Sequence, residues 1–439
     1  MRGNSRLQRL ATFGMMAVLA LTLAACEQSH PNTTFTPHSE YGRAIDFLWD
    51  RLLLLGTIVF VLVEAGLIYI MIRYRKRDGD TRPPQTHGNV VIEIIWTLIP
   101  AFILLFIAVP TVRTVFKTQA KAVAGALEIE VIGHQWWWEF RYPEYGITTA
   151  NEIYLPKGRT VNFKLTSNDV IHSFWIPQLG GKRDAITNRT NYIWLTPDST
   201  METAEWNGFC TEYCGTSHAK MRFRAFTVSP DQFASWVAAQ RAPAAFGAVA
   251  MGPPHVGSPT PVAQGGPVIR PGALAPTPPA LLADSAVAAP AATVSEASYT
   301  FPRNQPAFEY AKPHTPIPAG LTFTRGLTGN AHRGQQIFSS NACIGCHAIA
   351  GNPAAMGNIG PNLTHFGSRA TIGAGSFPNT PAYLALWIKN ARHMKPGILM
   401  PTLGMNEYDP VLKARVTKAQ GGLDDQQIAD IVAYLWALK

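Results

Sequence analysis

The densest group of chemically active side chains lies between Cys210 and Met221. This segment holds two thiols, an imidazole, a thioether and a carboxylate within twelve residues. Thiolate, thioether and imidazole groups are the ligands that copper prefers in proteins. A single cysteine with histidine and methionine would suit one copper ion, whereas two cysteines four positions apart can bridge two ions. The segment therefore predicts a copper site that is held by thiolates.

A second histidine must complete a site for two copper ions. His172, in the run Val-Ile-His-Ser-Phe-Trp, is the candidate. Two other interpretations of the same residues stay open. Cys210 and Cys214 could form a disulfide, or the cysteines and histidines could bind zinc, although zinc would not require Met221.

The run Cys343-Ile-Gly-Cys346-His347 is the attachment signature of a c-type haem. In this motif the two thiols add to the haem vinyl groups, and the adjacent histidine reaches the iron. An exported chain with no other metal-ligand spacing in this region favours haem attachment over a redox fold or a chance match. The motif therefore predicts a covalent haem c.

The sixth iron ligand is expected to be a methionine, which raises the reduction potential of the haem. We predict Met400 because it alone precedes a proline in the expected loop. Met394 and Met405 are the alternatives. If Met400 only filled the core, the iron would be open and would bind ligands rather than carry electrons.

The elements around the copper segment read as strands. Between about residues 125 and 228, apolar and polar residues alternate in short runs such as Leu127–Ile132 and Thr160–Leu165. Turn-forming residues such as Pro156-Lys-Gly separate these runs. We therefore predict an all-β Greek-key domain over residues 121–235.

The haem motif lies in a helical region that we assign to residues 329–439. The run from Leu423 to Trp436 opens with aspartates and repeats apolar residues at helical spacing. The run Gly334–Phe338 resembles the first helix of a class I cytochrome c, in which glycine permits close contact with the last helix. Tyr434 is the expected contact.

Two apolar runs and the basic loop between them predict that the later domains lie outside the cell membrane. Two apolar runs, 52–72 and 91–112, are each near the ~20 residues needed to cross a bilayer, and the basic cluster Arg73–Arg77 between them predicts a cytoplasmic loop. We predict a transmembrane hairpin over 45–120 with the later domains exported. The net charge of +9 is dispersed, so it does not predict nucleic-acid binding.

The sequence also predicts a function for the N-terminal segment and for the region that connects the two exported domains. A basic start and a short apolar stretch predict a signal peptide over residues 1–25, and Leu-Ala-Ala-Cys26 resembles a lipobox, which would make Cys26 the lipidated residue. An uncleaved anchor or a cut elsewhere is the alternative. The Pro-, Ala- and Gly-rich residues 240–325 predict a linker with no core of its own.

Together the hairpin, the β region and its metal motifs resemble subunit II of haem–copper cytochrome c oxidases. The match includes Gly-His-Gln-Trp-Trp-Trp at 133–138, His172 and the whole run from Cys210 to Met221. The resemblance implies a cupredoxin domain that holds the dinuclear copper centre CuA. With the cytochrome c region it resembles the caa3 type, so the predicted fold class is a two-helix hairpin, an all-β cupredoxin-like domain and an all-α cytochrome c domain.

The resemblance also implies a role for each copper-site residue. Cys210 and Cys214 would bridge the two coppers, and His172 and His218 would each bind one. Met221 would bind one copper, and the backbone carbonyl of Glu212 would bind the other. The Glu212 side chain would also bind Mg²⁺ at the border with subunit I.

Three further residues acquire roles from the resemblance. Trp136 corresponds to the aromatic ring that receives electrons, although three consecutive tryptophans leave open which ring matters. Glu93 matches an acid at the mouth of a proton channel, but an acid at a helix start is equally ordinary. Pro361 corresponds to the proline whose carbonyl accepts a hydrogen bond from the iron-binding histidine.

The implied function is electron transfer from haem c to CuA and then to haem a of subunit I. Oxygen would be reduced to water at haem a3 and CuB in that subunit, coupled to proton pumping. The implied partners are subunits I and III, the lipid bilayer, and an upstream cytochrome or quinol-oxidising complex, all at a bacterial inner membrane with both redox domains on the periplasmic side. A copper-free quinol-oxidase subunit and a diffusible carrier are the rival classes, and the intact copper ligands and the membrane hairpin argue against them.

Overall fold

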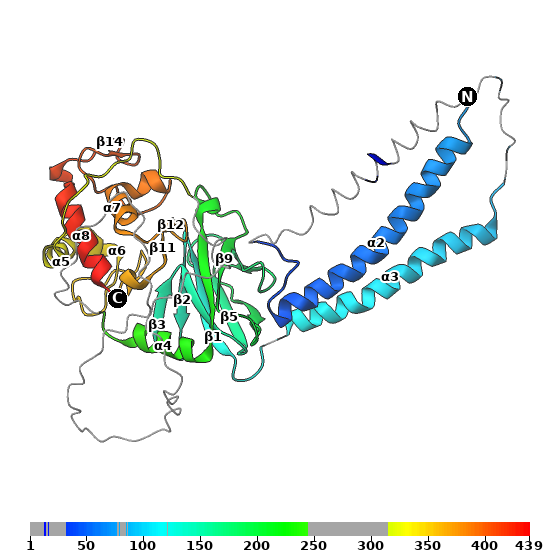
Figure 1. Cartoon of the computed structure of the whole chain (residues 1–439), viewed down its shortest axis with the longest axis horizontal. Coiled ribbons are helices and arrows are strands. Elements are labelled where there is room, and N and C mark those ends of the chain that lie inside the picture. The colour runs from blue at the N-terminus through cyan, green and yellow to red at the C-terminus, as the bar shows by residue number, and fades with distance from the viewer. Residues whose placement is uncertain are drawn as a thin grey trace, which may run out of the picture.

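The computed structural model describes residues 13, 14, 16, 32–76, 79, 85, 87–120, 122–244 and 315–439. These residues form a helical hairpin, a β sandwich and a helical domain, in that order along the long axis of the molecule (Figure 1). The predicted signal peptide, Cys26 and most of the predicted linker lie outside the described residues.

The hairpin consists of α2 (Glu40–Arg73) and α3 (Val90–Gln119). Both helices are long and apolar enough to cross a membrane, and the strongly apolar part of each is unburied by protein. The ends nearest the sandwich are joined by an ion pair of 2.8 Å between Lys117 and Glu40. Both apolar runs predicted from the sequence fall inside these helices.

The sandwich is built from two sheets of five strands each. The first has the order β3-β2-β1-β5-β8, and the second has the order β4-β10-β9-β6-β7. The strands of the first sheet are β1 (Leu127–His134), β2 (Trp137–Tyr142), β3 (Ile147–Ala150), β5 (Val161–Ser167) and β8 (Asn191–Leu195). Those of the second are β4 (Glu152–Pro156), β6 (His172–Trp175), β7 (Arg183–Ala185), β9 (Ala204–Cys210) and β10 (Arg222–Val228).

The alternation of buried and more exposed residues along the strands explains why they form two packed sheets. In β5 and β9 every second residue is buried, so each strand turns one face to the common core. The pairs β1–β5 and β4–β10 are parallel, and the other pairs are antiparallel. Helix α4 (Pro230–Arg241) closes one edge of the sandwich, where Trp236 stacks on Tyr154.

The C-terminal domain is helical, with small two-stranded hairpins. Its helices are α5 (Ala331–Ser340), α6 (Cys343–Cys346), α7 (Pro381–Met394) and α8 (Asp425–Ala437). Its short strands are β11 (Thr371–Ile372), β12 (Phe377–Pro378), β13 (Tyr408–Asp409) and β14 (Ala414–Arg415). Single 3₁₀ turns lie at η2 (His218–Lys220) in the sandwich and at η4 (Phe366–Ser368) and η5 (Lys418–Gln420) in this domain.

Helices α5 and α8 cross at Gly334. A Cβ atom on Gly334 would lie 2.0 Å from the carbonyl oxygen of Asp430 and 2.9 Å from the Tyr434 Cβ, so only glycine permits this approach. Phe338 then packs edge-on against Tyr434 with ring centroids 5.7 Å apart. The predicted contact between Gly334 and Tyr434 is confirmed.

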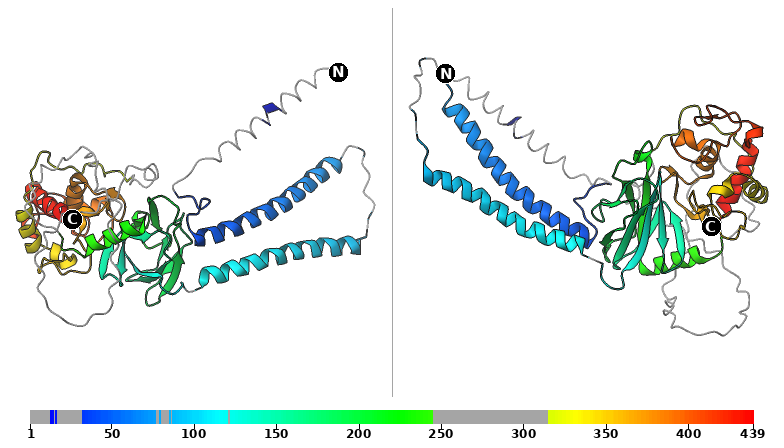
Figure 2. Two further views of the ribbon diagram at one scale, coloured as in Figure 1. Left: turned by 60° about the horizontal axis from the view of Figure 1, so that its bottom comes forward. Right: turned by 180° about the vertical axis from the view of Figure 1, so that it is seen from behind.

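The helical domain lies against the sandwich on the side away from the hairpin (Figures 1 and 2). Backbone and side-chain hydrogen bonds join residues 370–376 and 394–396 of the helical domain to the sandwich. The two domains that carry the predicted redox sites are therefore in direct contact.

Candidate metal and haem centres

Five sulfur and nitrogen side chains meet at one end of the sandwich. The Sγ atoms of Cys210 and Cys214 lie 3.8 Å apart and are not bonded to each other. His172 Nδ1 lies 3.8 Å from Cys210 Sγ, and His218 Nδ1 lies 3.6 Å from Cys214 Sγ. Met221 Sδ lies 3.7 Å from Cys214 Sγ. The structure thus brings these five predicted ligands together.

The arrangement fits two metal ions rather than one. A bond between a thiolate and a first-row ion such as zinc is about 2.3 Å long, so two sulfurs 3.8 Å apart can share an ion. The ligand atoms of His172, Cys210 and Cys214 all lie within 4.8 Å of one another, whereas His218 falls outside that group and lies beside Cys214. Each end of the sulfur pair therefore has its own imidazole.

The remaining donors complete both ends. The backbone carbonyl of Glu212 lies 3.3 Å from Cys210 Sγ, as expected for a ligand on that side, and its side chain is exposed. The Met221 thioether belongs to the other side and is fully buried. This set of soft donors suits copper, and a thioether has no place in an ordinary zinc site.

The local sequence explains the placement of the ligands. His172 begins β6 and Cys210 ends β9, and these neighbouring strands bring the two residues side by side. Cys214 and His218 follow in the connection between β9 and β10, which closes with the hydrogen bond from Cys210 N to Met221 O. The two parts of the site are 38 residues apart in sequence but share one edge of the fold.

His172 is held in position from two sides. Its Nε2 atom lies 2.8 Å from the carboxylate of Asp169, which also accepts hydrogen bonds from the backbone N–H groups of Gln135 and Val170. On the other side, a Cβ at Gly133 would lie 2.5 Å from the imidazole ring. The carboxylate fixes the ring so that Nδ1 faces the thiols.

Burial and mutual contact set the acidity of the thiols. The hydrogen bond from Cys214 lowers the pKa of Cys210 to about 4, and the same contact raises the pKa of Cys214. Burial alone would lower the pKa of His172, but its hydrogen bonds with Asp169 and Cys210 raise it above the usual value. The pair therefore readily supplies at least one thiolate for a metal.

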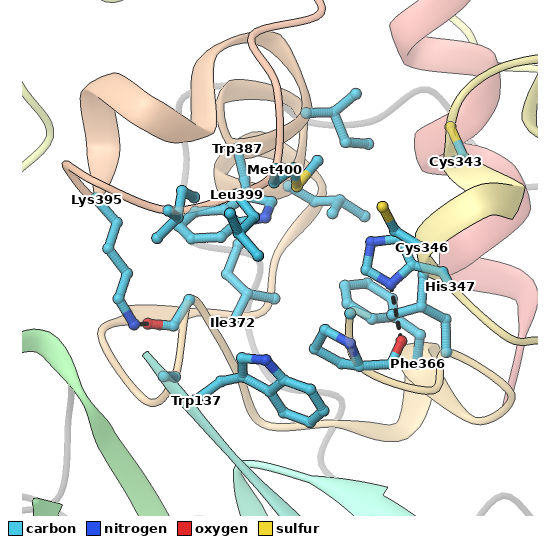
Figure 3. A pocket seen from close by; sticks show the side chains of 18 of the residues that line it. Trp137, Cys343, Cys346, His347, Phe366, Ile372, Trp387, Lys395, Leu399 and Met400 are labelled. Atoms are coloured by element: carbon cyan, nitrogen blue, oxygen red, sulfur yellow. Dashed lines mark hydrogen bonds between the residues drawn. The ribbon is translucent and has the colours of Figure 1, made fainter. Parts of the chain in front are cut away.

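The haem motif lines a large apolar cavity in the helical domain. The cavity has a volume of about 170 Å³ and is lined by Cys343, Cys346 and His347 together with apolar residues from α7, α8 and the loops (Figure 3). The His347 Nδ1–H donates to the Pro361 carbonyl at 2.8 Å, which leaves Nε2 free to bind iron. Burial also lowers the pKa of His347, so the ring is neutral, as an iron ligand must be.

Met400 lines this cavity, whereas Met394 and Met405 are not among its lining residues. Figure 3 shows Met400 and His347 reaching into the same space from different parts of the domain. Met394 is instead fully buried in the domain core. An apolar cavity with two thiols in its wall and a nitrogen and a thioether facing inwards fits a covalent six-coordinate haem.

Trp136 lies between the two centres. Its indole Nε1–H donates to the Cys214 carbonyl at 2.9 Å, and the same ring helps to line the haem cavity. Trp137 stacks on His134 and Trp138 packs in the sandwich core, although Trp137 also touches the cavity. Of the three tryptophans, only Trp136 both donates to the copper loop and lines the haem cavity.

Glu93 lies in the first turn of α3, just after Asn89 caps the helix. The Asn89 side chain accepts hydrogen bonds from the backbone N–H groups of Val91 and Ile92. An acid in this turn is favourable for the helix whatever else it does. The role of Glu93 in proton uptake therefore stays a prediction.

Three residues important to the arrangement were not assigned these roles from sequence. Asp169 orients His172, and an acid three residues before a ligand histidine was the available signal. Glu152 and Lys395 are buried charged groups at the domain contact. Burial lowers the pKa of Lys395 to about 7. No local pattern marked either residue, because each makes hydrogen bonds to residues of the other domain that are distant in sequence.

Three family models match the chain in succession. They are described as the transmembrane domain of cytochrome c oxidase subunit II over residues 35–114, the periplasmic domain of that subunit over 146–227, and cytochrome c over 331–439. The matches confirm the predicted fold class: two apolar helices, a cupredoxin-like β domain and a helical cytochrome c domain.

Curated relatives carry the same description. The chain is 28% identical to cytochrome c oxidase subunit 2 of Alkalihalophilus pseudofirmus, with 97% of this chain and 96% of the relative covered. It is 28% identical to the subunit of that name in Bacillus sp. PS3, with 99% of both chains covered. It is 33% identical to a probable cytochrome c oxidase subunit 2 of Rickettsia bellii, with 45% of this chain and 80% of the relative covered.

Proposed function

Because this chain belongs to the cytochrome c oxidase subunit II family, we propose that it is a donor–acceptor relay within the oxygen-reducing terminal oxidase. It accepts electrons at haem c, passes them to CuA, and delivers them to haem a of subunit I. Oxygen is reduced to water in subunit I, with coupled proton pumping. The observation that carries this proposal is Trp136, which touches both the copper loop and the haem cavity.

The copper ligands have distinct tasks. Cys210 and Cys214 would hold both ions through their thiolates, His172 and His218 would each supply an imidazole to one ion, and Met221 and the Glu212 carbonyl would supply the remaining donors. Two shared thiolates would spread one electron over both coppers, so that little geometry changes on reduction. The chain contributes rigidity, because four of these side chains are buried in a packed sandwich.

The haem ligands follow the same logic. Cys343 and Cys346 would hold the haem covalently, and His347 and Met400 would supply the nitrogen and sulfur ligands to its iron. The Pro361 carbonyl keeps the His347 ring in the tautomer that presents Nε2. The apolar walls exclude water, and the methionine raises the reduction potential so that the haem serves as a carrier.

Other residues extend the proposal to the assembly. The exposed Glu212 carboxylate binds Mg²⁺ at the border with subunit I, and Glu93 lies at the mouth of a proton path in that subunit. Cys26 carries lipid after signal cleavage. The hairpin spans the bacterial inner membrane beside subunits I and III, with both redox domains on the periplasmic side, and the upstream donor is a cytochrome or a quinol-oxidising complex.

Metal analysis of the purified oxidase tests this proposal. We expect two coppers and one covalent haem in this chain, a mixed-valence dicopper signal by electron paramagnetic resonance, and a low-spin c-haem spectrum. A chain with haem but no copper would contradict the relay and would favour a quinol-oxidase type of subunit. One relative, from Bacillus cereus, is described as quinol oxidase subunit 2 and is 32% identical over 198 residues. The copper measurement therefore has to distinguish between these two types of subunit.

A further inference from the structure

Two buried charged side chains lie at the contact between the sandwich and the haem domain. Glu152, at the start of β4, is 3% exposed, and Lys395, just after α7, is 2% exposed. They come from opposite domains and approach the contact from different elements. Charged groups are almost never this buried unless hydrogen bonds or partner charges satisfy them.

Glu152 belongs to the sandwich and binds the haem domain. Its Oε1 atom accepts hydrogen bonds from the backbone N–H groups of Ala370 and Thr371, at 2.7 and 2.8 Å. The Thr371 hydroxyl donates to the same oxygen at 3.2 Å. All three donors lie at the start of the β11–β12 hairpin, which forms part of the haem cavity wall.

Lys395 belongs to the haem domain and binds the sandwich. Its Nζ donates to the backbone carbonyl of Trp136 at 2.5 Å and to that of Gly373 at 3.3 Å. The Lys395 Nζ group thus joins the tryptophan between the two centres to the same hairpin that Glu152 binds. Figure 3 shows the extended Lys395 side chain reaching down to the loop beside the cavity.

Adjacent contacts extend the same junction. Ser217, next to the copper ligand His218, donates to the Pro396 carbonyl at 2.5 Å, and Lys220 donates to the Met394 carbonyl at 3.1 Å. A Cβ on Gly397 would lie 2.9 Å from the Trp136 ring, so this loop packs directly on the indole. The sandwich therefore closes one wall of the haem cavity.

We propose that Glu152 and Lys395 are positioning residues that latch the haem domain onto the sandwich in one orientation, with the haem cavity against Trp136. This inference rests on the proposed function, because it concerns the step from haem c to CuA. In that step one electron leaves the haem iron, which goes from ferrous to ferric, and the copper pair gains it. No bond breaks and no proton moves.

The chemistry of the latch favours one fixed geometry. An apolar contact tolerates sliding, whereas a buried carboxylate or ammonium is costly unless its donors or acceptors are in place. Without the latch the haem domain stays joined by the chain, and each transfer requires a new encounter at an effective concentration in the millimolar range. The latch replaces repeated encounters with a permanent contact.

Substitution of Glu152 in the full chain, within the purified oxidase, tests the proposal. In Glu152→Ala we expect faster amide deuterium uptake in the segment 366–376, because Ala370 and Thr371 lose their acceptor. We also expect photoinduced electron transfer from haem c to CuA to slow by about tenfold or more, since small displacements of reacting groups have effects of this size. Glu152→Gln keeps one acceptor oxygen, so its deuterium uptake and its transfer rate should lie between those of the wild type and those of Glu152→Ala.

Two further variants make the result decisive. Glu144→Ala removes an exposed sandwich carboxylate that pairs with Arg159, and it should leave both measurements unchanged. Lys395→Met removes the second half of the latch and should slow transfer in the same way, which keeps the test available if Glu152→Ala does not assemble.

Three outcomes have separate meanings. If Glu152→Ala exposes the amides but transfer keeps its wild-type rate, Glu152 does not position the haem. If these amides already exchange freely in the wild type, the latch does not exist in solution. If the wild type itself binds no copper or shows no transfer from haem to copper, the proposed function fails, whatever the variants do.

Discussion

At the copper site the histidine and methionine donors already lie within 3.8 Å of a thiol, whereas the residues at the haem site surround a cavity of about 170 Å³. The copper ligands are fixed by strands and by each other in a packed core. The residues proposed to hold the haem instead line a cavity that the protein's own side chains do not fill. We therefore expect the sandwich to fold before it binds metal, whereas the haem domain should depend on its haem.

The largest expected effect is loss of haem attachment. In Cys343→Ala with Cys346→Ala, the cavity would be left empty or would collapse. At roughly 24 cal/mol per Å³, an empty cavity of about 170 Å³ would cost about 4 kcal/mol, and the loss of the haem's own packing contacts adds to this cost against a typical domain stability of about 5–15 kcal/mol. We expect calorimetry to show no cooperative transition for the haem domain and limited proteolysis to remove it.

The matched variant at the other site is Cys210→Ser with Cys214→Ser. It should lose copper, yet the sandwich should still unfold cooperatively, since its core of aromatic and branched side chains remains. A cooperative transition in the haem-free domain, or the loss of one in the copper-free sandwich, would contradict this difference between the two domains.

The second-largest expected effect concerns the sixth ligand of the haem iron. In Met400→Ala the thioether is lost, and we expect the haem potential to fall by a sizeable fraction of the ~0.8 V range that axial ligands span. Spectroelectrochemical titration measures it. Met394→Leu and Met405→Leu should leave the potential near its wild-type value, because neither side chain lines the cavity. If the haem potential fell in one of those two variants and not in Met400→Ala, that methionine would be the sixth ligand in place of Met400.

The same contrast explains how much the sequence could predict. The segment Cys210–Met221 and the motif at 343–347 are local, so their chemistry could be read directly from residue types and spacing. His172 and Met400 are distant in sequence, yet their neighbours marked them and the structure brings each to its site. Strand alternation likewise predicted β1 and β5 to within one or two residues.

What the sequence could not predict depends on contacts between domains. Lys395 lies in a Lys-Pro-Gly run that is typical of an exposed turn, and Glu152 begins an ordinary strand. Each makes hydrogen bonds across the contact between the haem domain and the sandwich, and no sequence periodicity encodes that contact. The role of Asp169 was missed for a related reason, because a hydrogen bond to a ring nitrogen leaves no repeating pattern.

A third prediction tests how firmly the copper site is preassembled. In Asp169→Asn the amide cannot hold the His172 ring as the carboxylate does, and loss of such an orienting partner typically costs 10–100-fold in metal affinity. Competition with a copper chelator measures the change. Asp184→Asn, at an exposed sandwich position, is the control and should bind copper as the wild type does. Unchanged affinity in Asp169→Asn would show that packing alone, including Gly133, orients the ring.

The smallest expected effect concerns acid stability of the haem domain. Asp409 is fully buried beside the Met400 loop, and its carboxylate pairs with Arg392 at 2.6 Å. Burial alone would raise the pKa of Asp409, but backbone N–H groups of Leu412, Val411 and Thr402 and the Arg392 guanidinium lower it to about 2. Ionised Asp409 therefore stabilises the folded domain by roughly 2 kcal/mol near neutral pH.

A lowered pKa fixes the sign of the pH dependence. The contribution of Asp409 is present above its ordinary value of 3.8 and disappears as the pH falls towards 2. Asp409→Asn should thus destabilise the haem domain by roughly 2 kcal/mol at pH 7, and the difference from wild type should shrink steadily below pH 4. Denaturation followed by the haem absorption reports this domain alone. A pH-independent difference would mean that Asp409 acts through its shape and neutral hydrogen bonds, and that the walls of the haem cavity do not depend on a buried charge.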